Sequence, residues 1–230
     1  MIWREKLQSN MDFNLLLLSP FYLYLILLYS LYLQIRFNNM IKELLNKNPL
    51  YVFALESEAS DKFVNESPLF IGVGKVNAAY HLTKQIAQSK PSIIINLGSA
   101  GSNFFERGSV ICCTQFIQRD MNVTTLGCEL YETPFSNTKP ILEYGIRIDS
   151  LQEGVCGTGD SFEMSHNTSD YNIVDMEAYP LAYIAKKEDI PFLCLKYISD
   201  GADDNAAEDW NITVKKAAEA LRQAIDELKR

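Results

Sequence analysis

Residues 92–101 read Ser-Ile-Ile-Ile-Asn-Leu-Gly-Ser-Ala-Gly. A short apolar run rich in β-branched residues is typical of a strand that is buried on both faces. Small and polar residues follow the run, and open α/β sheets bind their ligands beyond the carboxyl ends of the strands. This stretch therefore predicts a central strand that leads into a binding site.

On both sides of residues 92–101, short apolar runs alternate with stretches of helical periodicity. We predict further strands at 51–55, 69–73, 109–116, 153–157 and 192–198, with the central strand over 92–97. Helices are expected at about 75–88, 177–188 and 208–229, the last with apolar residues at three- and four-residue intervals. Strands that alternate with helices predict an α/β fold with a central mixed, mostly parallel sheet flanked by helices.

The first 48 residues form a separate segment, ahead of a single α/β domain at 49–230. Residues 15–33 carry no charge and reach the ~20 residues that a membrane-spanning helix needs. Arg36, Lys42 and Lys47 follow this run, which would leave the C-terminal domain on the cytoplasmic, inner face of the membrane. Two interpretations remain open: a membrane anchor, or translation that starts at Met40.

Composition excludes several classes of function. The net charge of -8 and the lack of any run of basic residues argue against a general nucleic-acid binder, which favours a small-molecule partner. The five cysteines have no CxxC spacing, so free thiols are expected. The two histidines, His81 and His166, match no metal-ligand spacing, which disfavours metal hydrolases and Ser-His-Asp triads. Carboxylates must therefore carry any acid–base chemistry.

Six motifs, in order along the chain, resemble those of the methylthioadenosine/S-adenosylhomocysteine nucleosidases of the purine and uridine phosphorylase superfamily. They are Ala54-Leu55-Glu56-Ser57-Glu58, Gly72-Val73-Gly74-Lys75-Val76-Asn77-Ala78-Ala79, Asn96-Leu97-Gly98-Ser99-Ala100-Gly101, Gly159-Asp160-Ser161-Phe162, Val174-Asp175-Met176-Glu177-Ala178 and Ile198-Ser199-Asp200. The resemblance covers nearly all of 51–230 and none of 1–48. It implies a three-layer fold, a homodimer, and hydrolysis of the N-glycosidic bond of 5'-modified adenosines without a metal or cofactor.

The resemblance also implies the roles of the two catalytic residues. Asp200 matches the acid that protonates N7 of adenine, so its pKa must be raised by burial or by a neighbouring carboxylate. Glu58 matches the carboxylate that polarises the attacking water, which Ser99 and the Gly98 backbone help to position. The two carboxylates would act on opposite faces of the sugar, as in inverting glycosidases.

Substrate-binding roles follow from the same motifs. Glu177 matches the residue that accepts hydrogen bonds from the ribose hydroxyls, Met176 packs against the sugar, and Phe162 stacks on adenine. Glu163 either accepts a hydrogen bond from the adenine amino group or faces solvent. Ser199, next to the acid, completes the predicted set, whereas Glu56 is expected to be solvated or structural.

Two alternatives to a hydrolase are a nucleoside phosphorylase and a nucleoside-binding module without activity. The phosphorylases of the superfamily bind phosphate with arginines, one at the position of Asn96 and another in the first glycine-rich loop, and this sequence has neither. Its acidic loop after the first strand would repel phosphate. A binder without turnover would not need the acid–base pair. The segments between Glu58 and Gly72 and between Asp120 and Val155 are shorter than the family usually has, and the second is expected to lack a helix.

Overall fold

The computed structural model describes residues 20–203 and 206–230. The chain divides into two compact units, Met1–Glu43 and Leu44–Arg230. Helix α2 (Pro20–Lys47) crosses this boundary. No helix in the described part of the chain has both the length and the apolar character that crossing a bilayer requires. Residues 15–19 of the predicted span lie outside the described residues, so the span at 15–33 stays a prediction.

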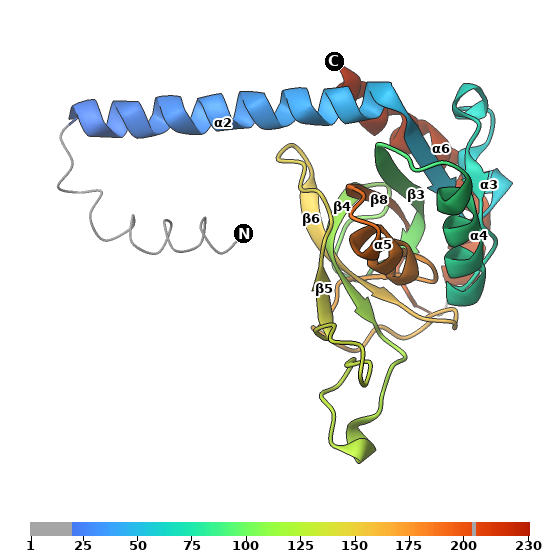
Figure 1. Cartoon of the computed structure of the whole chain (residues 1–230). Coiled ribbons are helices and arrows are strands. Elements are labelled where there is room, and N and C mark those ends of the chain that lie inside the picture. Colours follow the sequence, from blue (N-terminus) through green and yellow to red (C-terminus); the bar gives the residue numbers. More distant parts are fainter. Residues whose placement is uncertain (1–19, 204–205) are drawn as a thin grey trace. The chain divides into compact units, whose positions relative to one another are not determined.

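The second unit contains one sheet of eight strands (Figure 1). The strands are β1 (Pro49–Phe53), β2 (Leu69–Phe70), β3 (Ile93–Gly101), β4 (Val110–Gln118), β5 (Ile141–Glu143), β6 (Gln152–Thr158), β7 (Ile173–Asp175) and β8 (Phe192–Asp200). Five of the strand pairs are parallel and three are antiparallel. The predicted mixed, mostly parallel sheet is confirmed.

The sequence suggested an open sheet. The structure differs, because five of the strands close into a ring. Strand β3 pairs with β8 and, at its last residue, with β7, while β4 joins β8 to β6 and β6 joins β7. The register of the β3–β8 pair shifts between Ala100 and Gly101, and such a bulge bends a strand. Gly101 then lies opposite Val174 of β7, which closes the ring.

Helices cover both faces of the sheet, which gives three layers. Helices α4 (Lys75–Gln88) and α5 (Ala178–Lys187) contribute Leu82 and Leu181 to a core cluster that includes Ile94 of β3. Helix α6 (Ala206–Lys229) packs on β8 and β3, and its Arg222 lies over the ring of Phe63 at 5.4 Å. Successive residues of a strand point to opposite faces of the sheet. Because both faces are covered, the strands are apolar at successive positions.

The segments that were expected to be short have little regular structure. Between Glu58 and Gly72 lie only the 3₁₀ turn Val64–Glu66 and the two-residue strand β2, after the four-residue helix α3 (Glu56–Ala59). The loop between β4 and β5 contains the 3₁₀ turn Thr124–Leu126 and no α-helix, as expected. All five cysteines are free, and four of them are buried.

Candidate active site

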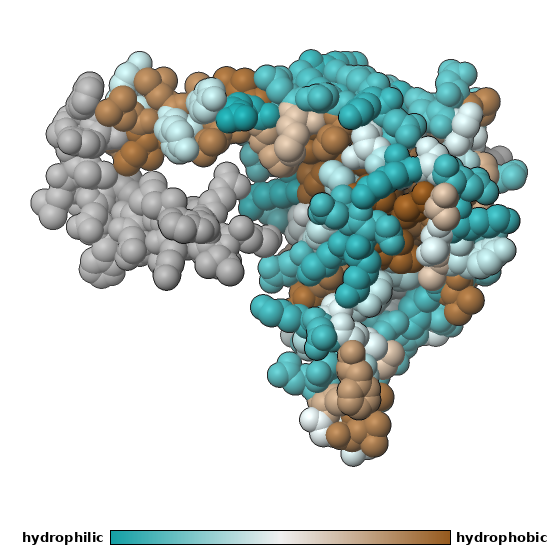
Figure 2. Space-filling view, viewed as in Figure 1, coloured by the Kyte–Doolittle hydropathy of each residue, from teal (hydrophilic) through white to brown (hydrophobic). Residues whose placement is uncertain are grey.

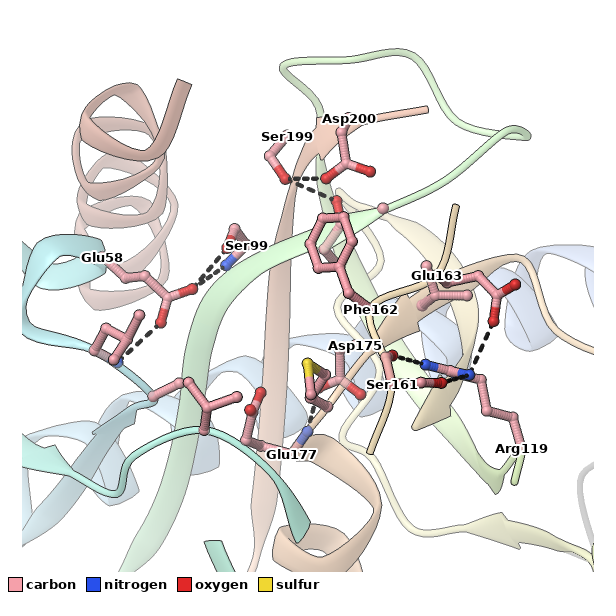
Figure 3. A pocket seen from close by; sticks show the side chains of 17 residues that line it. Glu58, Ser99, Arg119, Ser161, Phe162, Glu163, Asp175, Glu177, Ser199 and Asp200 are labelled. Carbon is pink, nitrogen blue, oxygen red and sulfur yellow. Dashed lines mark hydrogen bonds and ion pairs between the residues drawn. The ribbon is translucent and has the colours of Figure 1, made fainter. Parts of the chain in front are cut away.

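A pocket of about 240 Å³ opens where β3, β7 and β8 end (Figure 3). Eight of the nine predicted site residues line it. The lining consists of Ala54, Leu55, Glu58, Val73, Ser99, Ala100, Gly101, Arg119, Ser161, Phe162, Glu163, Val174, Asp175, Met176, Glu177, Ser199 and Asp200. Gly98 is the ninth, and it lies behind the lining, against the side chain of Glu58. The structure therefore brings the predicted residues together.

Glu58 is fixed at the first turn that follows β1. Its Oε1 accepts hydrogen bonds from the Ser99 backbone N–H at 2.8 Å and from Ser99 Oγ at 2.7 Å. Its Oε2 accepts from the Leu55 N–H at 3.2 Å, as an acidic residue in the first turn of a helix commonly does. A Cβ on Gly98 would lie 3.1 Å from Oε1, so the glycine leaves room for the carboxylate. The side chain is thus held in one orientation while it lines the pocket.

Asp200 ends β8 and is only 4% exposed. Its Oδ2 accepts a hydrogen bond from Ser199 Oγ at 2.7 Å, and its Oδ1 accepts from the Ala202 N–H at 2.9 Å. Burial raises the pKa of this carboxyl, although the two hydrogen bonds and the more distant Arg107 act against the rise. The direction agrees with the expectation for a group that must hold a proton.

Gly101 makes the position of Asp200 possible. A Cβ at residue 101 would lie 2.6 Å from Asp200 Oδ1 and 3.0 Å from a methyl group of Val174. Real Cβ atoms essentially never come within 3.0 Å of another atom, as this one would to Asp200, and both neighbours are buried. A glycine at the end of β3 is therefore a packing requirement of the site.

Glu177 caps the start of α5 and closes another side of the pocket. Its Oε1 accepts a hydrogen bond from the Gly74 N–H at 2.8 Å. Gly74 has a φ of +93°, in the region that favours glycine, so this N–H can be presented to the carboxylate. Burial and the neighbouring Asp175 raise the pKa of Glu177 to about 8, whereas Lys196 opposes the rise.

Asp175 and Lys196 form a buried ion pair beside Glu177, with Nζ and Oδ2 2.9 Å apart. Asp175 also accepts hydrogen bonds from Thr158 Oγ1 at 2.5 Å and from the Ala178 N–H at 2.8 Å. Burial alone would raise the pKa of Asp175, but the ammonium and these donors hold it below its usual value. Lys196 therefore keeps Asp175 in its ionised form.

Arg119, at the end of β4, is the lining residue that sequence reasoning missed. Its side chain is 6% exposed and donates from Nη1 to Glu163 Oε2 at 2.9 Å and to Ser161 Oγ at 3.1 Å. Its Nη2 donates to the Ser161 carbonyl. Glu163 is therefore held in an ion pair, and Phe162, 49% exposed, lies between the two residues that Arg119 binds. The sequence gave no signal for this, because Arg119 stands outside the six motifs.

Comparison with known proteins places this geometry in a family. The model of the phosphorylase superfamily matches residues 64–230. A 5'-methylthioadenosine/S-adenosylhomocysteine nucleosidase of Staphylococcus aureus is 29% identical over 177 residues, covering 68% of this chain and 78% of that protein.

Solved structures share the fold at lower identity. A putative nucleosidase of the same kind from Francisella philomiragia has a TM-score of 0.72 at 21% identity, covering 79% of this chain and 98% of that chain. A Helicobacter pylori futalosine hydrolase has a TM-score of 0.70 at 18% identity, with 78% and 97% covered. Because the family model spans most of the sequence and the resemblance seen in the motifs is confirmed, the chain belongs to the phosphorylase superfamily.

Proposed function

We propose that the protein hydrolyses the N-glycosidic bond of 5'-modified adenosines, namely methylthioadenosine, S-adenosylhomocysteine and 5'-deoxyadenosine, and releases adenine. One observation carries the proposal. Asp200, buried and with a raised pKa, and Glu58, fixed by three hydrogen bonds, line the same pocket from different strand ends (Figure 3). One group suited to give a proton and one suited to take a proton are what glycosidic hydrolysis requires.

Asp200 supplies the proton to the leaving group. As the bond between the anomeric carbon and N9 breaks, its electron pair passes to the purine, and Asp200 protonates N7 so that adenine leaves neutral. Ser199, through its hydrogen bond to Oδ2, keeps the acid in place. The raised pKa increases the fraction of Asp200 that holds a proton near neutral pH.

Glu58 and Ser99 act on the water. The water oxygen bonds to the anomeric carbon as one of its protons passes to Glu58, so that ribose gains a hydroxyl, Glu58 is left protonated and Asp200 is left ionised. Two of the bonds that hold Glu58 come from Ser99, so β3 positions the base directly. Gly98 supports this by leaving space for the carboxylate.

Glu177, Met176 and Phe162 bind the nucleoside. Glu177 accepts hydrogen bonds from the ribose hydroxyls, which favours its ionised form on binding and offsets the effect of burial. Met176 packs against the sugar, and the half-exposed ring of Phe162 stacks on the base.

Water is a better nucleophile than phosphate in this pocket. Five carboxylates line the pocket. Among the described lining residues Arg119 is the basic one, and its guanidinium is engaged by Glu163 and Ser161. Lys75, from the glycine-rich loop, pairs with Asp120 at 2.5 Å instead of lining the pocket. A phosphate dianion would therefore meet Glu58 and, among the described lining residues, no cation that is not already engaged by a carboxylate.

A phosphate-free assay of adenine release from the three nucleosides tests the proposal. We expect release without phosphate, and no stimulation by added phosphate. A requirement for phosphate would establish a phosphorylase. Tight nucleoside binding with no release under either condition would establish a binding module.

We further propose that the catalytic unit forms a homodimer. The loop between β4 and β5 exposes a group of apolar side chains at its tip, visible as the apolar projection in Figure 2. Phe135 is 102% exposed and Leu126 is 77% exposed, and exposed apolar patches commonly mark protein interfaces. Light scattering after size-exclusion chromatography should give a mass twice that of the chain. The substitution Phe135→Ser should lower the measured mass.

The N-terminal segment, residues 1–48, is proposed to tether the domain at 49–230 to the inner face of a membrane through residues 15–33. The absence of charge in that run supports this. Mass spectrometry of the native N-terminus, with membrane fractionation, tests it. A native chain that starts at Met40 and stays in the supernatant would refute the tether.

A further inference from the structure

Arg119 binds both neighbours of the ring that is proposed to stack on the base. It donates to the carbonyl and hydroxyl of Ser161 on one side of Phe162 and to the carboxylate of Glu163 on the other. These contacts join the end of β4 to a loop more than forty residues later in the chain. Phe162 itself is half-exposed, and both residues that flank it are bound by Arg119.

The guanidinium sits in a space that the fold leaves for it. The Arg119 backbone N–H donates to the Thr158 carbonyl at 2.9 Å, which fixes the end of β4 against β6. A Cβ on Gly159 would lie 2.8 Å from Arg119 Cζ and 3.0 Å from Nε. Gly159 therefore makes the cradle in which the guanidinium lies.

The Nε–H of Arg119 takes no part in the contacts with Ser161 and Glu163. Within the described part of the chain its Nε is buried and has no hydrogen-bond partner. A buried N–H without a partner costs free energy, and native structures contain few. After its contacts with Ser161 and Glu163, the guanidinium therefore keeps one donor that no described residue satisfies.

Glu163 has an oxygen to spare. Its Oε2 accepts from Arg119, whereas Oε1 has no hydrogen bond among the described residues. An ionised carboxylate can only accept hydrogen bonds. The 6-amino group of adenine offers N–H donors, whereas a 6-oxo purine places a carbonyl acceptor there, and two acceptors repel each other.

We propose that Arg119 is a positioning residue for the base, which holds Phe162 in place and leaves one oxygen of Glu163 to select a 6-amino purine over a 6-oxo purine. This selectivity rests on the proposed nucleosidase function and specifies the base that the pocket takes. Arg119 acts through Ser161 and Glu163 and is not required to touch the base.

Kinetics of the full-length protein on methylthioadenosine and on its 6-oxo counterpart, methylthioinosine, test the proposal. We expect the preference of the wild type for the 6-amino substrate, as a ratio of kcat/KM values, to fall at least about tenfold in Arg119→Met and in Glu163→Gln. The loss in Arg119→Met should lie mainly in KM. The double variant should lose no more than the worse single variant, because both changes disable one unit.

Two further variants separate positioning from loss of folding. Gly159→Ala keeps the arginine but places a methyl group against Cζ, and it should reproduce the fall in selectivity. Arg147→Met, the same chemical change in an exposed ion pair away from the pocket, should leave both rates unchanged. Thermal unfolding of each variant shows whether it is folded.

Affinity for free adenine and hypoxanthine, measured by calorimetry, judges the proposal without turnover. A wild type that hydrolyses neither nucleoside overturns the proposed function, while the ratio of the two base affinities still tests the role of Arg119. An unchanged ratio in folded Arg119→Met and Glu163→Gln overturns the inference even if adenine release proceeds normally.

Discussion

Asp175 and Asp200 are both buried aspartates in the wall of one pocket, yet their surroundings drive their protonation in opposite directions. Asp175 has an ammonium 2.9 Å away and a pKa below the usual value. Asp200 has only a hydroxyl and a backbone N–H against its oxygens, and its pKa is raised. A cation within contact distance outweighs burial, whereas neutral donors do not. The partner decides which carboxylate can hold a proton for catalysis.

The largest expected effect comes from removing the unpaired acid. Asp200→Asn should lower kcat for adenine release by at least about 10³-fold, because the amide cannot protonate N7. Initial rates with methylthioadenosine measure this. Asp203→Asn, a half-exposed carboxylate outside the pocket, is the matched control and should retain most activity. Activity of Asp200→Asn within tenfold of wild type would remove Asp200 from the mechanism.

Removing the cation from the paired carboxylate should harm stability. Lys196→Met leaves Asp175 buried without a counter-charge, which we expect to lower the free energy of unfolding by about 3 to 5 kcal/mol. Urea denaturation measures the change. Lys187→Met, at an exposed lysine, should stay close to wild type. If Lys196→Met is as stable as wild type, the ion pair is not what holds Asp175 ionised.

The pH dependence of stability tests the other carboxylate with a raised pKa. Between the ordinary pKa of 4.5 and about 8, folded Glu177 holds a proton that the unfolded chain has released. The free energy of unfolding should therefore fall as pH rises through this window, by on the order of a few kcal/mol, and then level off. In Glu177→Gln this part of the fall should be absent. Equal pH profiles for both proteins would place the titration elsewhere.

The smallest expected effect concerns the neutral donor of Asp200. Ser199→Ala removes a hydrogen bond that favours the ionised carboxylate, so the pKa of Asp200 should rise further. The alkaline limb of the kcat/KM profile should move to higher pH by less than about one unit. A shift to lower pH would mean that the hydroxyl stabilises the protonated form.

Periodicity predicted most of the elements but not their closure into a ring. Helix α4 begins and ends where its apolar spacing indicated, and all six predicted strands are present. Strands β5 and β7, of three residues each, are too short for an alternating pattern to appear. The pairing of β3 with β7 rests on one register pair, Gly101 with Val174, which no local pattern encodes.

The motifs predicted the site residues because each motif keeps its residues close in sequence. Arg119 escaped because its partners, Ser161 and Glu163, lie more than forty residues later and meet it only through the pairing of β4 with β6. The ion pair of Asp175 with Lys196 is hidden for the same reason: Asp175 lies in one of the six motifs and Lys196 in a predicted strand, but their contact depends on the closed ring. Contacts between charged residues that are far apart in the sequence therefore could not be predicted.

The ring of five strands has a consequence for how the protein loses activity. Ser99, Asp175 and Asp200 lie on β3, β7 and β8, which are ring members paired to one another through β3. A local opening that separated these residues would have to break the ring itself, and with it the main core of the unit. These three residues therefore belong to one cooperative unit of the fold, and heat inactivation that results from their separation should follow global unfolding instead of preceding it.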